Sequence, residues 1–177
     1  MHIKKAEPED WQLIADIGRQ SWEETFTGLH HYTPELVAGY TNGAFNKKQV
    51  MQEMATVTSS FYLVSESADL PPAGYIKLKV DGQPECVKNR KIMGLERLYF
   101  LKKLQGKGIG RKAFAFALAE ARKQGYPEIW LSVWEYNEPA LGFYNKMGCT
   151  RVGSWDWTFE YDGNKVVDLD YIMVCKT

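Results

Sequence analysis

Apolar residues in the first third of the chain recur three or four positions apart, the spacing of one helix face. Leu13, Ile14 and Ile17 begin such a stripe, which continues towards aromatic residues further along. The Pro-Glu-Asp sequence at 8–10 suits a first helical turn, because proline is tolerated there and acidic side chains favour the positive end of the helix dipole. We therefore predict a helix with one buried face from about residue 8, after a short strand at 2–6.

Two more helix starts follow in this part of the chain. Thr33 and Pro34 begin a second, short helix, with proline again in the first turn. Asn46 suits the N-cap of a third, and Gln49 stands at the position where a capping box places Glu or Gln. The first third of the chain is therefore predicted to be mainly helical.

The pattern changes from helix to strand near residue 60. Two stretches, 60–67 and 73–81, are rich in β-branched and aromatic residues and flank a proline-rich turn at 70–72. Such an arrangement is typical of two neighbouring strands. A polar stretch at 82–94 leads to a third strand, which we predict at 95–101.

Helices and strands alternate through the rest of the chain. The expected elements are a helix at 110–124, a strand at 128–134, a helix at 137–148, and strands at about 150–160 and 166–175. The unit from 95 to 134 predicts a parallel, right-handed crossover, and the outer strand pairs are expected to be antiparallel hairpins. We therefore predict an α/β fold with a mixed sheet and helices on its faces.

Composition supports a single folded unit, which we place at 1–177. Of the 177 residues, 45% are hydrophobic and 14% aromatic, which is enough to fill a core and excludes a disordered chain. The net charge is zero, so a general nucleic-acid binder is not expected. Charge is uneven, however: residues 1–72 hold ten acidic and five basic side chains, and the remainder is basic.

The cysteines and histidines give no metal site. Cys86, Cys149 and Cys175 are odd in number and far apart, so we expect reduced thiols and a cytoplasmic protein. His30 and His31 have no third ligand at a suitable spacing. The amino-terminal stretch lacks an apolar signal core and no apolar run reaches about 18 residues, so we expect no membrane association.

Three glycines stand at alternate positions within a basic stretch at 101–113, LKKLQGKGIGRKA. Gly106, Gly108 and Gly110 leave the backbone open to close approach, and a predicted helix begins directly after them. Backbone N–H groups at a helix start form an anion site. The surrounding cations, which suit a ligand with several phosphates, are Lys102, Lys103, Lys107, Arg111 and Lys112.

Other interpretations of this loop remain open from its residues alone. A P-loop would need Ser or Thr after Gly106-Lys107, and Gly108 stands there instead. The segment 108–113, GIGRKA, fits the G-x-G-x-x-A dinucleotide fingerprint, with Glu135 at the end of the next strand, although a basic spacer separates it from the preceding strand. The simplest alternative is a glycine-rich turn on a solvated basic surface.

Three motifs in order resemble the GCN5-related N-acetyltransferase (GNAT) family. QGKGIG at 105–110 matches the signature Q/R-x-x-G-x-G/A, while LERLYF at 95–100 and EIWLSVWEYN at 128–137 look like the fourth and fifth strands of the family. NEPALGFYNKMG at 137–148 is similar to the helix with the pattern A-x-x-F-Y-x-K-x-G. Cys149 replaces the usual aromatic after this helix, and the front half matches only loosely. Within the family, these stretches look most like those of bacterial spermidine/spermine acetyltransferases.

The resemblance implies a mostly antiparallel central sheet whose fourth and fifth strands are parallel and splay apart, with helices on both faces. Acetyl-CoA would lie in that cleft as co-substrate, without a metal. Its pantetheine arm would pair with the backbone of Leu98, Tyr99 and Phe100 like an added strand. Its phosphates would contact Gln105, Gly106, Lys107, Gly108, Ile109, Gly110 and Arg111.

Three residues of the 137–148 helix also correspond to the family's site. Tyr144 aligns with the general acid, whose phenol protonates the leaving thiolate; the alternative is an aromatic side chain in the core. Asn137 would touch the cofactor, cap the helix, or do both. Lys146 would reach a phosphate or remain a solvated charge.

A base is needed because an amine with a pKa near about 10 is protonated at neutral pH and has no lone pair for attack. Glu96 on the strand at the cleft is our candidate, acting through water. The alternative is a strand carboxylate paired with Arg97 or Lys77. The family often uses a chain of waters instead of one named base.

In the family that the chain resembles, the first helices and their loop line the acceptor side, so the resemblance places the acceptor amine there. Carboxylates beside aromatic faces suit a cation by charge and by cation–π attraction. The candidate residues are Trp22, Glu23, Glu24, Phe26 and Tyr32. The equally weighted alternative is a helix whose aromatics face the core and whose acids face water.

These expectations describe an acetyl-CoA-dependent N-acetyltransferase of a small primary amine, with a polyamine such as spermidine or spermine as acceptor. Transfer would be direct, within a ternary complex, since no cysteine stands in an activated setting. The alternatives are acetylation of a protein or peptide N-terminus, and a CoA-binding regulatory module without catalysis. A homodimer is possible, and no nucleic-acid partner is expected.

Overall fold

The computed structural model describes residues 1–177, the side chain of Asn164 excepted. The described residues form one mixed sheet of seven strands in the order β1-β2-β3-β4-β5-β7-β6. The strands are β1 (His2–Lys5), β2 (Ser59–Ser65), β3 (Gly74–Lys79), β4 (Ile92–Phe100), β5 (Glu128–Trp134), β6 (Thr150–Tyr161) and β7 (Asn164–Lys176). The helices are α1 (Trp11–Phe26), α2 (Pro34–Ala44), α3 (Lys47–Ala55), α4 (Ile109–Lys123) and α5 (Glu138–Lys146), with 3-10 turns at Pro8–Asp10, Glu85–Val87 and Lys102–Leu104.

The pairing of the strands confirms the predicted mixed sheet. Every neighbouring pair is antiparallel except β4 and β5, which are parallel and joined through α4. The two strands pair only between Ile92–Gly94 and Glu128–Trp130. Beyond that seam each continues without the other, which leaves one side of β4 open where the sequence predicts a cleft.

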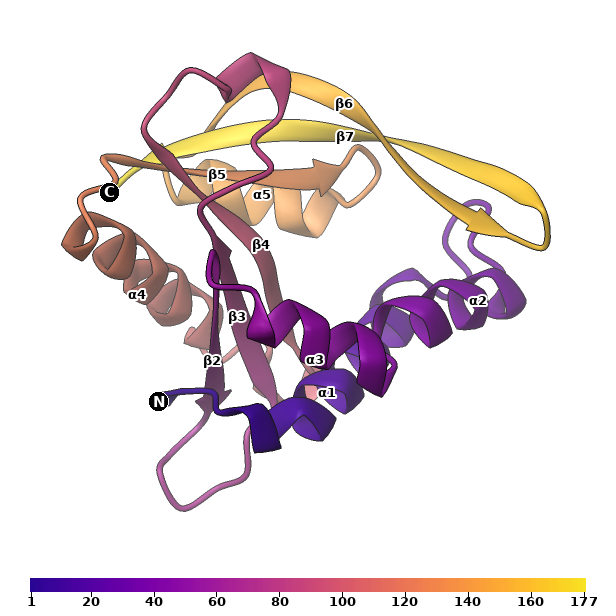
Figure 1. Cartoon of the computed structure of the whole chain (residues 1–177), viewed down its shortest axis with the longest axis horizontal. Helices are drawn as coiled ribbons and strands as arrows, with labels where there is room; N and C mark the ends of the chain where they lie inside the picture. Colours follow the sequence, from indigo (N-terminus) through magenta and orange to yellow (C-terminus); the bar gives the residue numbers. More distant parts are fainter.

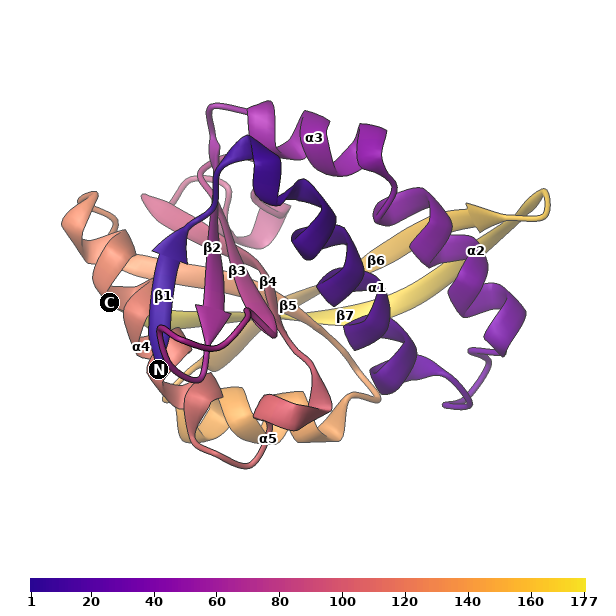
Figure 2. The same ribbon diagram turned by 90° about the horizontal axis from the view of Figure 1, so that it is seen from below.

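The helices cover both faces of the sheet. Figure 2 shows α1, α2 and α3 gathered on one side and α4 and α5 on the other. The hairpin of β6 and β7 runs out beyond the rest of the sheet, and β6 contacts α2 (Figure 1). None of the described helices combines the length and the apolar character needed to cross a bilayer.

Local sequence explains most element boundaries. The side chain of Asn46 accepts a hydrogen bond from the Gln49 N–H at 2.9 Å, as an N-cap should, and Asn137 does the same for Ala140 at 3.2 Å. Ile14 and Ile17 are buried as predicted. Leu13 is not, with 39% of its surface exposed, so its place in the buried stripe was wrong: it lies just beyond the edge of the face that packs on the sheet.

The prediction for β4 was also wrong at its start. The strand begins at Ile92, inside the stretch predicted to be polar and irregular. A glycine at position 94 weakens the strand pattern in the sequence. The fold favours it, because a Cβ there would make a tight contact of 3.1 Å with the indole of Trp130. The residues missed are the ones that pair with β5.

Candidate active site

A cleft of about 1140 Å³ opens where β4 and β5 separate. Its walls come from α1, β4, the glycine loop, β5, α5 and the β6–β7 hairpin, so it reaches both faces of the sheet. The predicted site residues that line it are Trp22, Glu24, Phe26, Tyr32, Glu96, Leu98, Tyr99, Phe100, Gln105, Gly106, Gly108, Gly110, Arg111, Asn137 and Tyr144. Segments from both halves of the chain therefore meet at one site.

Four predicted site residues are not among the described residues that line this cleft. Glu23 is exposed on α1, and Lys146 is exposed on α5. Lys107 forms an ion pair with Glu66 at 2.8 Å, and Ile109 is buried in the core, where it anchors the first turn of α4. The part of Ile109 available to a ligand is its backbone.

A β-bulge turns Glu96 towards the cleft. In the pairing of β3 with β4, Lys77 stands opposite Arg97 and Leu78 opposite Leu95, so Glu96 is the extra residue. Its side chain is about one third exposed and accepts a hydrogen bond from the Lys77 ammonium at 2.6 Å. The alternative of a paired strand carboxylate is therefore realised with Lys77. A role as general base stays a prediction.

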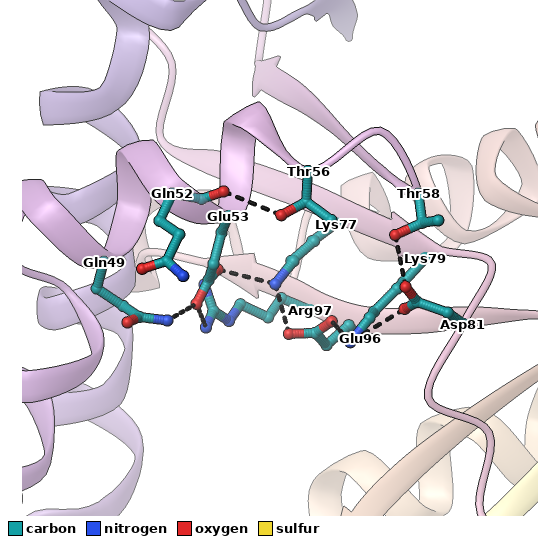
Figure 3. A network of polar contacts seen from close by, with 10 residues as sticks. All are labelled: Gln49, Gln52, Glu53, Thr56, Thr58, Lys77, Lys79, Asp81, Glu96 and Arg97. Carbon is teal, nitrogen blue, oxygen red and sulfur yellow. Dashed lines mark hydrogen bonds and ion pairs between the residues drawn. The ribbon is translucent and has the colours of Figure 1, made fainter.

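A buried ion network supports this wall (Figure 3). Glu53 of α3 accepts hydrogen bonds from Lys77 at 2.8 Å and from both terminal nitrogens of Arg97 at 2.8 and 3.0 Å. Burial alone would raise the pKa of Glu53, but the charges of Arg97 and Lys77 outweigh it and lower the pKa. Glu53 thus holds Arg97, while Glu96 pairs with Lys77 at 2.6 Å and with Lys79 at 4.0 Å.

The glycine loop has the geometry of an anion cradle. Gly106 and Gly108 both have φ of +72°, and a Cβ at either position would meet no atom within 4 Å. Gly108 is the N-cap of α4 and has no side chain with which to cap it, whereas Thr33, Asn46 and Asn137 cap α2, α3 and α5. The first N–H groups of α4 thus point out of the helix without an intrahelical partner. Such a helix start fits a pyrophosphate.

Neighbouring contacts fix the loop in place. The backbone N–H of Lys102 donates to the Glu24 carboxylate at 2.9 Å, and the Gln105 side-chain amide donates to the Phe100 carbonyl at 3.3 Å. Arg111 faces the cleft from the first turn of α4. Glu24, predicted to bind the acceptor, therefore holds the turn after β4 while also lining the cleft.

Tyr144 reaches the cleft from α5. Its ring packs edge-on against Phe114 and Phe143, with centroids 5.6 and 5.1 Å away. Burial raises the pKa of its phenol, and the nearby Cys149 and Tyr99 raise it further. The hydroxyl is therefore held in the protonated form, which can donate a proton or a hydrogen bond.

The aromatic side chains of α1 are both cleft wall and core. Trp22 is only 5% exposed, and its indole N–H donates to the Tyr99 hydroxyl at 3.2 Å. Phe26 and Tyr40 pack on Trp22 with ring centroids 4.1 Å away. The aromatic side chains of this helix fill the core and also face the cleft at their edges. The two alternatives for the helix, a cleft wall and a core-facing helix, are therefore both realised.

Two acidic residues of the cleft were missed by the sequence analysis. Asp168 and Asp170 on β7 both line it, and they are only 4% and 8% exposed. They alternate along the strand on the same face as the buried Ile172 and Val174. The sequence signal that could have revealed them is two acidic residues at the same alternate spacing as the buried residues of this strand. Groups of three or more His, Cys, Asp or Glu suited to a metal are absent from the described residues.

Burial raises the pKa of Asp170 to about 6, and the charge of Asp168 adds to the effect, while Ser132 and Trp155 oppose it. The unfolded value is about 3.9, so a difference of about 2 units corresponds to about 3 kcal/mol. The pKa of Asp170 is higher in the folded protein than in the unfolded one, so its ionisation lowers the free energy of unfolding. This loss is absent below pH 4, grows as pH rises, and is complete above pH 6.

We therefore expect the stability of the variant Asp170→Asn, relative to wild type, to increase by up to about 3 kcal/mol between pH 4 and pH 8. Urea unfolding of both proteins at the two pH values measures this difference. A difference that stays constant with pH would show that Asp170 has an ordinary pKa in the folded protein.

Comparison with known proteins places these features in a family. The sequence profile described as the acetyltransferase (GNAT) family matches residues 19–149. An uncharacterized N-acetyltransferase in the pepI 3′ region of Lactobacillus delbrueckii subsp. lactis is 33% identical over 84% of each chain. The spermidine N(1)-acetyltransferase of Thermoplasma acidophilum is 26% identical over 84% of this chain and 87% of its own. The crystal structure of PaiA N-acetyltransferase from the same organism, in complex with coenzyme A, has a TM-score of 0.73 at 24% identity and covers 99% of this chain and 98% of its own.

Proposed function

The chain belongs to the GNAT family of acetyltransferases, and from this membership we propose that it transfers the acetyl group of acetyl-CoA directly to a primary amine of a polyamine. The coarser part of this statement, acetyl-CoA-dependent N-acetyl transfer, is the activity of the family. The choice of acceptor is our own inference. The observation that carries it is a single cleft that joins an uncapped helix start, a protonated tyrosine and a wall of carboxylates and aromatic rings.

The residues of the cleft fit acetyl-CoA. Gly106 and Gly108 leave room for phosphate oxygens, and the free N–H groups at the start of α4 are aligned to donate to them. Within the described part of the chain, β4 has no strand partner beyond Gly94 on the β5 side, so its backbone is available to an extended arm. When bound, acetyl-CoA supplies an activated acetyl thioester.

Two side chains would handle the protons. Tyr144, which burial keeps protonated, would donate a hydrogen bond or its proton to the sulfur that leaves as thiolate, and its raised pKa favours the hydrogen bond. Glu96, on the bulge of β4, would accept the proton of the acceptor ammonium through water. Its hydrogen bond from Lys77 occupies one carboxylate oxygen, so a water relay suits it better than direct contact.

A polyamine acceptor is favoured by the charge and shape of the cleft. Glu96, Asp168 and Asp170 face it together with several aromatic rings, and such walls attract cations. The relative from Thermoplasma acidophilum is named for its action on spermidine, which points the same way. We place the reaction in the cytoplasm, in keeping with three cysteines that are free thiols.

An acceptor panel tests this proposal. We expect release of free CoA thiol with spermidine and spermine, with kcat/KM at least about 10-fold above that for a peptide with a free N-terminus, because the peptide brings fewer positive charges to the acidic wall. Mass spectrometry of the products identifies the acetylated nitrogen.

Two results would contradict the proposal in different ways. Turnover with the peptide alone would favour an N-terminal acetyltransferase. Tight CoA binding without turnover of any acceptor would favour a regulatory module that binds CoA but has lost its chemistry.

A further inference from the structure

Asp168 and Asp170 differ in how their charges are stabilised. Asp168 accepts hydrogen bonds from the Tyr32 hydroxyl and from the Trp134 indole N–H at 3.1 Å, and His31 lies 3.3 Å away. Its position is therefore fixed by the protein. No ion pair among the described residues includes Asp170, although 92% of its surface is buried.

A buried carboxylate without a positive partner is costly for a fold. Ser132 offers Asp170 a neutral hydrogen-bond donor, and the negative charge of Asp168 opposes its ionisation. Neither arrangement compensates a charge removed from water. A cation from outside the chain would do so, and the cleft gives it access.

The walls around Asp170 suit an organic cation. Its cross-strand neighbours are Trp134 on β5 and Trp155 on β6, and Trp157 stands opposite Asp168. These three indoles and Asp170 line the same cleft. Aromatic faces beside a carboxylate hold an ammonium with its methylene chain better than they hold a hydrated metal ion.

An independent observation concerns unpaired donors in this wall, where the buried indole N–H of Trp155 has no hydrogen-bond partner among the described residues. The indole N–H of Trp130 is buried and has no hydrogen-bond partner among the described residues. Trp130 is only 7% exposed and lines the cleft on the face shared with Ser132 and Trp134. A buried donor is left unpaired in few proteins, so a molecule in the cleft that offers an acceptor, such as water, is expected there, whereas an ammonium can only donate.

We propose that Asp170, with Asp168 beside it, binds a second ammonium group of the acceptor, remote from the nitrogen that is acetylated. This inference rests on the proposed function and adds a selection rule to it. A substrate with two or more positive charges fits the cleft, and a monoamine of the same length leaves Asp170 without a partner.

The test compares two acceptors that differ by one terminal ammonium, 1,5-diaminopentane and pentylamine. We expect wild type to prefer the diamine in kcat/KM by about 10- to 100-fold, as for loss of one buried charge-assisted contact. In Asp170→Asn the preference should fall to near unity, mainly through a higher KM for the diamine. Asp170→Glu, which restores the charge, should recover part of it.

Asp156→Asn is the matched control, because it removes the same charge from an exposed position on the neighbouring strand β6. It should keep the wild-type preference, and CoA affinity measured by calorimetry should be unchanged in all variants. A diamine preference that survives in Asp170→Asn would overturn this inference and leave the proposed function standing. A wild-type enzyme that accepts neither diamines nor polyamines would overturn both.

Discussion

Replacing Tyr144 with phenylalanine should lower kcat by about 10- to 1000-fold, the usual contribution of a positioned general acid. The phenol is the group on α5 that faces the cleft with its proton held in place, because burial raises its pKa. Phenylalanine keeps the ring and its packing on Phe114 and removes only the hydroxyl. The loss should therefore appear in kcat, with CoA affinity close to that of wild type.

Steady-state kinetics with spermidine, together with calorimetric titration of CoA, measures the two quantities separately. Tyr126→Phe serves as the control, since it deletes the same atom in the turn between α4 and β5, outside the described cleft wall. An unchanged kcat in Tyr144→Phe would return this residue to the hydrophobic core, the alternative that the sequence left open.

Replacing Gly108 with valine should weaken CoA binding by about 10- to 100-fold, corresponding to one or two lost charge-assisted hydrogen bonds. Gly108 is the N-cap of α4 with φ of +72°, and the space around it is open. A β-branched side chain would fill that space, and it would also strain the left-handed backbone by about 1–2 kcal/mol. Calorimetric titration of CoA measures the affinity.

A second glycine separates the two effects of this substitution. Gly148 has φ of +84° after α5, also with open space around it, and it is not among the described residues of the cleft. Gly148→Val should bring comparable backbone strain without weakening CoA binding. Equal affinities in wild type and Gly108→Val would show that the loop does not hold the phosphates.

The fold and the cofactor side of the site could be predicted because their determinants are local in sequence. The cap at Asn46, the glycines at 106 and 108 and the helix around Tyr144 each reveal their structure within a few residues. Their order along the chain identified the family before the sheet was known. Leu13 was misplaced at the edge of the buried helix face, and β4 was predicted to begin too late. In both cases tertiary packing overrode the local sequence pattern.

The residues on the acceptor side of the cleft are brought there by contacts between distant strands, which no local sequence pattern reveals. Asp168 and Asp170 reach the cleft only because β7 inserts between β5 and β6. The bulge that exposes Glu96 arises from the register of β4 against β3. Glu23, chosen from its neighbours in sequence, is exposed on α1, whereas the buried carboxylates stand about 145 positions later in the chain.

The short pairing between β4 and β5 has a consequence for how strongly a bound ligand can stabilise the protein against unfolding. Three residue pairs join the two halves of the sheet, and among the described residues no strand pairs with the backbone of β4 beyond them on that side. An acetyl-CoA molecule that takes this place would complete the sheet, so the free energy of unfolding would rise with the logarithm of its concentration above Kd. Resistance of the purified protein to proteolysis would then rise with the acetyl-CoA concentration.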